Sequence, residues 1–202
     1  MDHRAWDERY AGDDLVWTAD ANRFLVAEID GMRPGRALDL ACGEGRNAVW
    51  LAERGWAVTA VDFSAVGLDK ARGLAGARGV SVQYELGDVT DYEPPATGFD
   101  LVIVMYLHLP KASRRIAFRR AAAAVAPAGT LLLVAHDSTN LTDGWGGPRD
   151  ANVLYGPDDV VAELDGFEIL KAERVRRPVP TDAGEKVAID VLVRARRRRP
   201  VG

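Results

Sequence analysis

Three residues near the start of the chain are spaced as they would be in a ligand site. Gly43 and Gly45 form a turn after the apolar run Ala37–Cys42, and Asp62 ends the apolar run that follows. Glycine lets the backbone approach a ligand closely, and the start of a helix offers unpaired N–H groups. An acid that closes the second strand can accept hydrogen bonds from ribose hydroxyls. The pattern therefore predicts a site for a cofactor that contains a nucleoside.

Two classes of cofactor fit this layout, and Asp39 separates them. The turn reads Gly43-x-Gly45-x-x-Ala48, which also satisfies a relaxed dinucleotide fingerprint, and Asp62 stands where a dehydrogenase would need an acid. A dinucleotide brings a pyrophosphate to this turn, and a carboxylate inside the first strand would repel it. S-adenosylmethionine brings a cationic amino group and a sulfonium, which a carboxylate attracts. The residues therefore favour S-adenosylmethionine, and an NAD(P)-dependent oxidoreductase remains the alternative.

The elements that must position these residues alternate along the chain. Apolar runs and helical periodicity predict an α/β fold, a Rossmann-like three-layer sandwich around a mostly parallel sheet. Helices are expected at 19–29, 47–54, 65–77, 110–126 and 157–164, with Ser64 as the N-cap of the third. Strands are expected at 37–42, 57–61, 80–86, 99–105 and 130–135, and as a closing antiparallel pair at 167–175 and 185–194. A long loop, Asp137–Asp150, is expected to cover the substrate side.

The motifs in this frame resemble a known family. D-L-A-C-G-E-G-R-N at Asp39–Asn47, V-D-F-S at Val61–Ser64 and G-D-V at Gly87–Val89 resemble class I S-adenosylmethionine-dependent methyltransferases. The N-terminal W-D-E-R-Y, Trp17 and N-R-F-L resemble the small bacterial group that includes the tellurite-resistance and thiopurine methyltransferases. The resemblance implies a seven-stranded sheet. One departure is Ala41, which stands where the superfamily usually has its first glycine, and we expect the fold to tolerate it.

The resemblance also implies which residues contact the cofactor. Asp39 would attract the amino group, Asp62 would bind the ribose, and Phe63 would lie against the adenine. Strand-end capping by Asp62 and Asp88, core packing of Phe63 and a purely anchoring Trp17 are the alternatives. The full expected set is Trp17, Asp39, Ala41, Gly43, Gly45, Asn47, Asp62, Phe63, Asp88, Val89 and Val104. Cys42 is expected to be a small buried residue and not a nucleophile.

The chemistry implied is in-line transfer of a methyl group from positive sulfur to a nucleophile. A general base is needed only for a nucleophile that is protonated at neutral pH, such as a hydroxyl; a thiolate or metalloid oxyanion needs none. Polar residues expected near the reacting atoms are Tyr106, His108, His136 and Arg149. Each also has an ordinary structural explanation, so the sequence assigns no catalytic residue. The acceptor is expected to be a small molecule that offers O, S, N or a metalloid oxyanion.

Composition bounds the remaining possibilities. With 202 residues, 48% of them hydrophobic, the chain suits one domain: a helical lid segment at 1–35, a core at 36–195 and a basic tail at 196–202. One cysteine, a polar start and the lack of an apolar run of about 18 residues favour the cytoplasm, with no membrane partner. A net charge of −4 and the lack of an N-P-P-Y motif after the fourth strand disfavour nucleic acid, although the arginine tail keeps that alternative open. No metal is expected, and the protein could be a monomer or a homodimer.

Overall fold

Seven strands form one sheet in the computed structural model, which describes residues 3–199. The strand order is β3-β2-β1-β4-β5-β7-β6, and only the pairs β5–β7 and β7–β6 are antiparallel. The strands are β1 (Arg36–Leu40), β2 (Ala57–Asp62), β3 (Gln83–Leu86), β4 (Phe99–Met105), β5 (Val125–His136), β6 (Phe167–Val179) and β7 (Lys186–Arg197). The predicted seven-stranded sheet with a closing antiparallel pair is confirmed.

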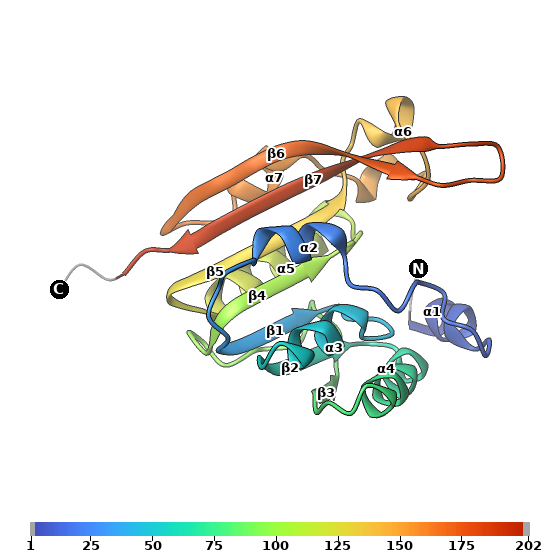
Figure 1. Ribbon diagram of the computed structural model, residues 1–202. Coiled ribbons are helices and arrows are strands. Elements are labelled where there is room, and N and C mark those ends of the chain that lie inside the picture. The colour runs from blue at the N-terminus through green and yellow to red at the C-terminus, as the bar shows by residue number, and fades with distance from the viewer. Residues whose placement is uncertain (1–2, 200–202) are drawn as a thin grey trace.

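Helices cover both faces of the sheet and make three layers (Figure 1). The helices α2, α3 and α4 lie on one face, and α5 and α7 lie on the other, as the two apolar clusters of the core also require. The helices are α1 (His3–Tyr10), α2 (Arg23–Glu28), α3 (Arg46–Glu53), α4 (Ala65–Ala77), α5 (Lys111–Ala124), α6 (Asn140–Asp143), the 3-10 helix η1 (Ala151–Val153) and α7 (Pro157–Val161). Ser64 caps α4 as predicted, because its hydroxyl oxygen accepts a hydrogen bond from the Gly67 N–H.

The central strands are buried on both faces because helices cover both. Leu38 and Leu40 face the α5 side of the sheet, whereas Ala37 faces the α3 side, which is the period of two expected for a strand. The order of connection reverses between β1 and β4, since the chain winds outward from β1 to β3 and then returns to β4. Open α/β sheets bind ligands at the carboxyl ends of strands beside such a reversal. The topology therefore places a binding site at the carboxyl ends of β1 and β4.

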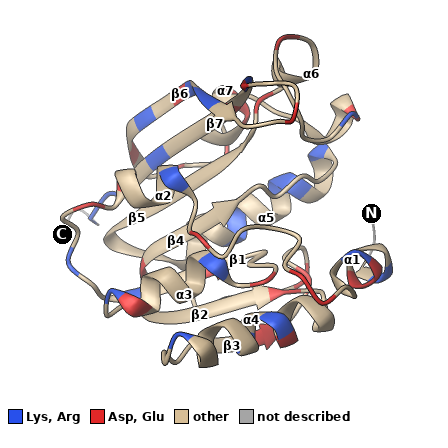
Figure 2. Cartoon of the chain, turned by 45° about the vertical axis from the view of Figure 1, so that its right-hand side comes forward, with Lys and Arg blue, Asp and Glu red and all other residues tan. Residues whose placement is uncertain are grey.

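The β6–β7 hairpin is longer than the sequence predicts. It projects beyond the carboxyl ends of the other strands (Figure 1), and the basic residues of β6 are marked along it in Figure 2. At the other end, the expected tail at 196–202 begins too early. Arg196 and Arg197 belong to β7, and the Arg197 guanidinium donates to three carbonyl oxygens at the end of α5. The remaining part of that tail at 200–202, like residues 1–2 of the expected lid segment, lies outside the described residues.

Several shorter boundaries also differ for local reasons. The helix expected at 19–29 begins only at Arg23, because the Asn22 side chain caps it. Pro110 is the N-cap of α5 and not its first helical residue. The loop Asp137–Asp150 contains the short helix α6, and Asn140 holds it to the sheet through hydrogen bonds with the Ile189 N–H and the Gly146 carbonyl. Among residues 3–199, no helix is both long and apolar enough to cross a membrane.

Candidate functional site

The turn between β1 and α3 has the backbone shape that the glycine pattern predicts. Ala41, Gly43 and Gly45 have φ values of 62°, 55° and 79°, all in the left-handed region. A Cβ on Gly43 would lie 2.8 Å from the Tyr10 hydroxyl oxygen, and one on Gly45 would lie 2.7 Å from the Ala71 Cβ. Both positions therefore need glycine. Ala41 adopts the same region at a cost of about 1–2 kcal/mol, which a glycine would avoid.

Asp39 is a fully buried carboxylate without a partner. It is 0% exposed, and neither carboxylate oxygen has a hydrogen-bond partner among the described residues. Burial and the nearby Asp62 raise the pKa of the Asp39 carboxyl from 3.8 to about 7, although Arg46 opposes them. The Ala48 N–H favours the charged form slightly, but it does not form a hydrogen bond of acceptable geometry. An unpaired buried carboxylate is costly, so its presence beside the glycine turn calls for a cationic ligand group.

Asp62 ends β2 and lies beside the same turn. One carboxylate oxygen accepts from the Gly43 N–H at 2.8 Å, and the other accepts from the Ser64 N–H at 2.9 Å. Asp62 therefore does cap the strand end, as one alternative proposed. Each carboxylate oxygen has a second lone pair, so both can still accept from a ligand hydroxyl. Burial raises the pKa of Asp62, and its backbone donors oppose that shift.

The N-terminal segment covers this turn. Tyr10 is 4% exposed, and its hydroxyl lies against Gly43. The Glu44 carboxylate accepts from the Val16 and Trp17 N–H groups at 3.0 and 3.2 Å, and Lys70 donates to it at 3.2 Å. The segment is therefore fastened above the site by Glu44. Trp17 itself is 42% exposed and packs under the Arg9 guanidinium, so its ring anchors α1 in this structure.

The other predicted cofactor residues divide into those that face the turn and those that do not. Asn47 is buried and accepts from the Asn22 N–H at 2.9 Å, so its side-chain oxygen ties α3 to α2. Asp88 is exposed and accepts from Thr90 in a local turn, while Phe63 is half-buried after β2. Val104 packs its side chain on the α5 face, opposite to Asp39. Its side chain therefore belongs to the core, and only its backbone reaches the carboxyl edge. Val89, after β3, is also buried in that core cluster.

A second polar cluster lies at the carboxyl ends of β4 and β5 and at the neighbouring amino-terminal half of β7. The Tyr106 hydroxyl donates to Asp190 Oδ2 at 2.9 Å, and Arg177 Nε donates to the same oxygen at 2.8 Å. His136 Nδ1 lies 3.2 Å from Asp190 Oδ1. Burial opposes ionisation, yet His136 and Arg177 hold the pKa of the Asp190 carboxyl below its ordinary value. Tyr106 adopts φ 57°, a strained shape for a tyrosine, directly after β4.

The remaining candidates on the acceptor side, His108 and Arg149, lie in different surroundings. Burial and the neighbouring His136 lower the pKa of His108 from 6.5 to about 3, so its ring is neutral. His108 Nε2 accepts a hydrogen bond from the His136 backbone N–H at 3.2 Å, which gives it a structural role. Arg149 is exposed in the loop, and no hydrogen bond or ion pair engages it within residues 3–199. The structure therefore brings Tyr106 and His136 together and leaves Arg149 apart from them.

Comparison with known proteins agrees with this geometry. Residues 37–129 match the family model described as methyltransferase domain. The glycine N-methyltransferase of Rattus norvegicus is 27% identical over 171 residues, which cover 77% of this chain and 58% of that protein. The structure described as conversion of a disulfide bond into a thioacetal group during echinomycin biosynthesis superposes with a TM-score of 0.78 at 23% identity, over 98% of this chain and 94% of that one. TehB from Haemophilus influenzae superposes with a TM-score of 0.75 at 16% identity, over 97% and 67% of the two chains.

The chain is therefore similar to methyltransferases over residues 37–129, and it shares its fold with a solved structure described as a SAM-dependent methyltransferase. It spans 58% of the length of the glycine N-methyltransferases that it matches. The cofactor that this similarity implies is S-adenosyl-L-methionine, and the residues present fit it. The unpaired Asp39 carboxylate supplies a partner for a cationic amino group, and the glycine turn leaves the close approach that a side chain would fill.

Sequence reasoning missed four residues of this candidate site. Glu44 and Arg46 lie in the E-G-R-N motif itself, and their charge next to the glycines could have indicated them. Burial lowers the pKa of the Arg46 guanidinium, while Tyr106 and Asp39 oppose that shift, so Arg46 lies within reach of both halves of the site. Arg177 and Asp190 lie far along the chain on β6 and β7. Only the pairing of those strands brings them to Tyr106.

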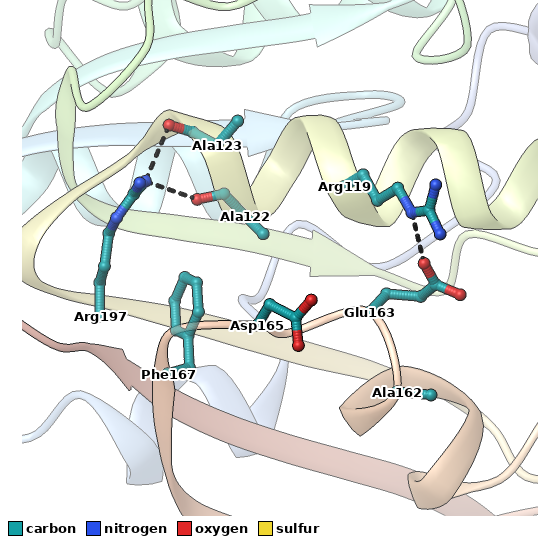
Figure 3. Close-up of a pocket in the computed structure, with 8 residues that line it drawn as sticks. All are labelled: Arg119, Ala122, Ala123, Ala162, Glu163, Asp165, Phe167 and Arg197. Carbon is teal, nitrogen blue, oxygen red and sulfur yellow. Dashed lines mark hydrogen bonds and ion pairs between the residues drawn. The ribbon is translucent and has the colours of Figure 1, made fainter.

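A pocket at the opposite, amino edge of the sheet is not part of this site. Its lining residues are Arg119, Ala122, Ala123, Ala162, Glu163, Asp165, Phe167 and Arg197 (Figure 3). Glu163 pairs with Arg119 at 2.6 Å, and Arg197 caps the end of α5. None of these eight described residues carries a buried polar atom without a partner. We therefore assign the pocket a structural role.

Proposed function

We propose that this protein transfers the methyl group of S-adenosylmethionine to a small molecule. The observation that carries the proposal is the buried, unpartnered Asp39 carboxylate beside a turn that only glycine fits. A cationic amino group would pair with Asp39 and remove the penalty of its burial. The same carboxylate would repel a pyrophosphate, which weighs against the NAD(P)-dependent oxidoreductase considered as the alternative.

Each half of the site has a task in this reaction. The turn at Gly43 and Gly45, with Asp39 and Asp62, would hold the methionine and ribose parts of the cofactor. Tyr106, directly after β4, would border the sulfonium. Glu44 fastens the N-terminal segment over the site, and a covered site excludes water from the reacting atoms. S-adenosylmethionine supplies the methyl group, and the protein supplies in-line positioning.

The identity of the acceptor is supported only as a class. The relatives include glycine N-methyltransferases and ubiquinone biosynthesis O-methyltransferases, whose names describe small acceptors. Arg196 and Arg197, which kept a nucleic-acid acceptor open, are part of β7 and are held by Glu168 and by α5. We therefore favour a small molecule with a heteroatom nucleophile, in a single-domain cytoplasmic enzyme that is a monomer or a homodimer. The tellurite-resistance and thiopurine group remains a prediction from the N-terminal motifs.

Calorimetric titration and a turnover assay test the proposal together. We expect S-adenosylmethionine and S-adenosylhomocysteine to bind in the micromolar range, and NAD to bind at least tenfold more weakly. A panel of small hydroxyl, amine, thiol and oxyanion acceptors is then screened for release of S-adenosylhomocysteine. Tighter binding of NAD than of S-adenosylmethionine would replace the proposal with the oxidoreductase alternative.

A further inference from the structure

His136 at the end of β5 and Asp190 on β7 form an arrangement that the proposed binding of the cofactor does not use. His136 pairs with Asp190 across the β5–β7 ladder, so their side chains lie on the same face of the sheet. His136 Nδ1 lies 3.2 Å from Asp190 Oδ1. Both atoms are buried, and neither has a hydrogen-bond partner among the described residues. A proton on Nδ1 shared with Oδ1 is the arrangement that leaves neither atom unpaired.

The second oxygen of Asp190 is fixed by two other donors. The Tyr106 hydroxyl and Arg177 Nε both donate to Oδ2, at 2.9 and 2.8 Å. Asp190 is 0% exposed, so water does not compete for either oxygen. Donors from the end of β4 and from β6 therefore orient this carboxylate, and Oδ1 remains to face His136. A histidine whose Nδ1–H donates to a fixed carboxylate presents a lone pair on Nε2.

The other side of the His136 ring faces the loop Asp137–Asp150. The loop passes across the ring at Gly147, where a Cβ would lie 2.8 Å from His136 Nε2. Glycine at that position, with φ 76°, leaves the nitrogen uncovered. Within residues 3–199, no hydrogen bond engages Nε2 of His136. The rings of Tyr106 and His108 lie 5.1 and 5.5 Å from the His136 ring, centroid to centroid, and hold its plane.

We infer that His136 is the proton acceptor of the methyl transfer, with Asp190 as its positioning residue. The inference rests on the proposed function and specifies its substrate class: a hydroxyl or an ammonium group, which must lose a proton, and not a thiolate or an oxyanion. A bond forms between the acceptor atom and the methyl carbon as the carbon–sulfur bond breaks. The electron pair of that bond goes to sulfur and gives neutral S-adenosylhomocysteine. The proton of the acceptor passes to His136 Nε2, and Asp190 stabilises the resulting imidazolium.

The charged and titratable groups around the ring are consistent with this role. Asp190 faces Nδ1 from β7, and Arg177 reaches it from β6 only through Asp190 Oδ2. Tyr106 and His108 face the ring from the end of β4; burial raises the pKa of Tyr106, and His108 is neutral. Arg46 approaches Tyr106 from α3. Among these groups, Asp190 is therefore the anion that faces His136. Nε2 of His136 is the basic nitrogen atom that none of them contacts through a hydrogen bond.

Nitrogen NMR of the histidine rings tests the tautomer directly, without any acceptor. The chain has three histidines, so His3→Gln and His108→Gln variants assign the His136 signals. The full-length protein with bound S-adenosylhomocysteine should show the Nδ1–H tautomer of His136. In Asp190→Asn, the amide oxygen should stay with Tyr106 and Arg177, and its NH2 should donate to Nδ1. His136 should then become the Nε2–H tautomer. A wild-type ring protonated on Nε2, or an unchanged tautomer in the variant, would overturn the inference.

Kinetics provides the second readout, with catechol, glycine and dithiothreitol as hydroxyl, amine and thiol probes. His136→Asn should lower kcat about 10²–10⁴-fold with the hydroxyl or amine probe that is methylated. The affinity for S-adenosylhomocysteine should stay within threefold, as it should in the control His3→Gln. Methylation of dithiothreitol alone, or full kcat in His136→Asn, would contradict the inference. If the wild-type protein does not bind S-adenosylhomocysteine, the proposed function is refuted, whichever tautomer His136 adopts.

Discussion

At the amino edge of the sheet the buried charges are paired, whereas at the carboxyl edge Asp39 is buried alone. Glu163, with a side chain 5% exposed, accepts from Arg119 (Figure 3) and from Arg115. Arg197 donates to the carbonyl oxygens of Ala122 and Ala123 (Figure 3) and to that of Val125. Asp39 is 0% exposed and has no partner in the described chain. The paired charges at the amino edge therefore stabilise the fold. The unpaired Asp39 carboxylate at the carboxyl edge destabilises it and is available to bind a ligand. Substitutions at the two edges should have opposite effects on stability and binding.

The largest expected effect comes from Asp39→Asn. The pKa of this carboxyl is about 7 in the folded protein and 3.8 ordinarily, so the group favours folding at low pH and this contribution disappears as the pH rises from about 4 to about 7. The free energy of unfolding of the variant, relative to that of the wild type, should therefore increase as the pH rises from 4 to 8, by up to about 4 kcal/mol. Its affinity for S-adenosylmethionine should fall at least tenfold.

Urea unfolding of the ligand-free proteins at both pH values measures the stability, and calorimetry measures the binding. If Asp39→Asn loses both stability at pH 8 and affinity, then the charge of Asp39 stabilises the fold, as the paired charges of the amino edge do. Glu163→Gln serves as the matched control, because it also removes a buried negative charge but lies at the other edge.

The next effect is expected from Arg197→Met at the amino edge. The variant keeps the aliphatic stem but removes the donor to the carbonyl oxygens of Ala122, Ala123 and Val125. Three unpaired carbonyls at a helix end should destabilise the fold by about 1–3 kcal/mol. Affinity for S-adenosylhomocysteine should stay within twofold. A tenfold loss of affinity would show that the amino edge also supports ligand binding, which would contradict the difference between the two edges.

A smaller effect should follow from Glu44→Gln, which loosens the cover of the site. Gln cannot accept with both side-chain atoms, so the hydrogen bonds from Val16 and Trp17 and the ion pair with Lys70 cannot all persist. We expect a three- to tenfold loss of affinity for S-adenosylhomocysteine and faster hydrogen exchange at residues 14–18. Exchange that stays at the wild-type rate would show that Glu44 does not fasten the segment.

The two halves of the site differ in how far the sequence predicted them. Asp39, Gly43, Gly45 and Asp62 lie within one strand–turn–helix–strand unit, so their spacing alone indicated their arrangement. Asp190 and Arg177 reach Tyr106 only through the register of the β5–β7–β6 strands.

Local signals also misplaced some details of the fold. The alternation of polar and apolar residues at 167–175 did not indicate that β6 continues to Val179. The added residues are held by pairing with β7, which no local sequence signal reveals. Arg197 looked like a solvated tail residue because its partners lie at the end of α5, far away in the sequence.

The central claim is that Asp39 is the counter-charge of the bound cofactor, and proton release on binding tests it most directly. With a pKa of about 7, Asp39 is about half protonated at pH 7 before binding and should be fully ionised beside a cationic amino group. Calorimetric titration with S-adenosylhomocysteine, in two buffers of different ionisation enthalpy, should therefore show release of about half a proton at pH 7. Release should disappear in Asp39→Asn and at pH 9. Binding with the same proton balance in wild type and Asp39→Asn would contradict the account.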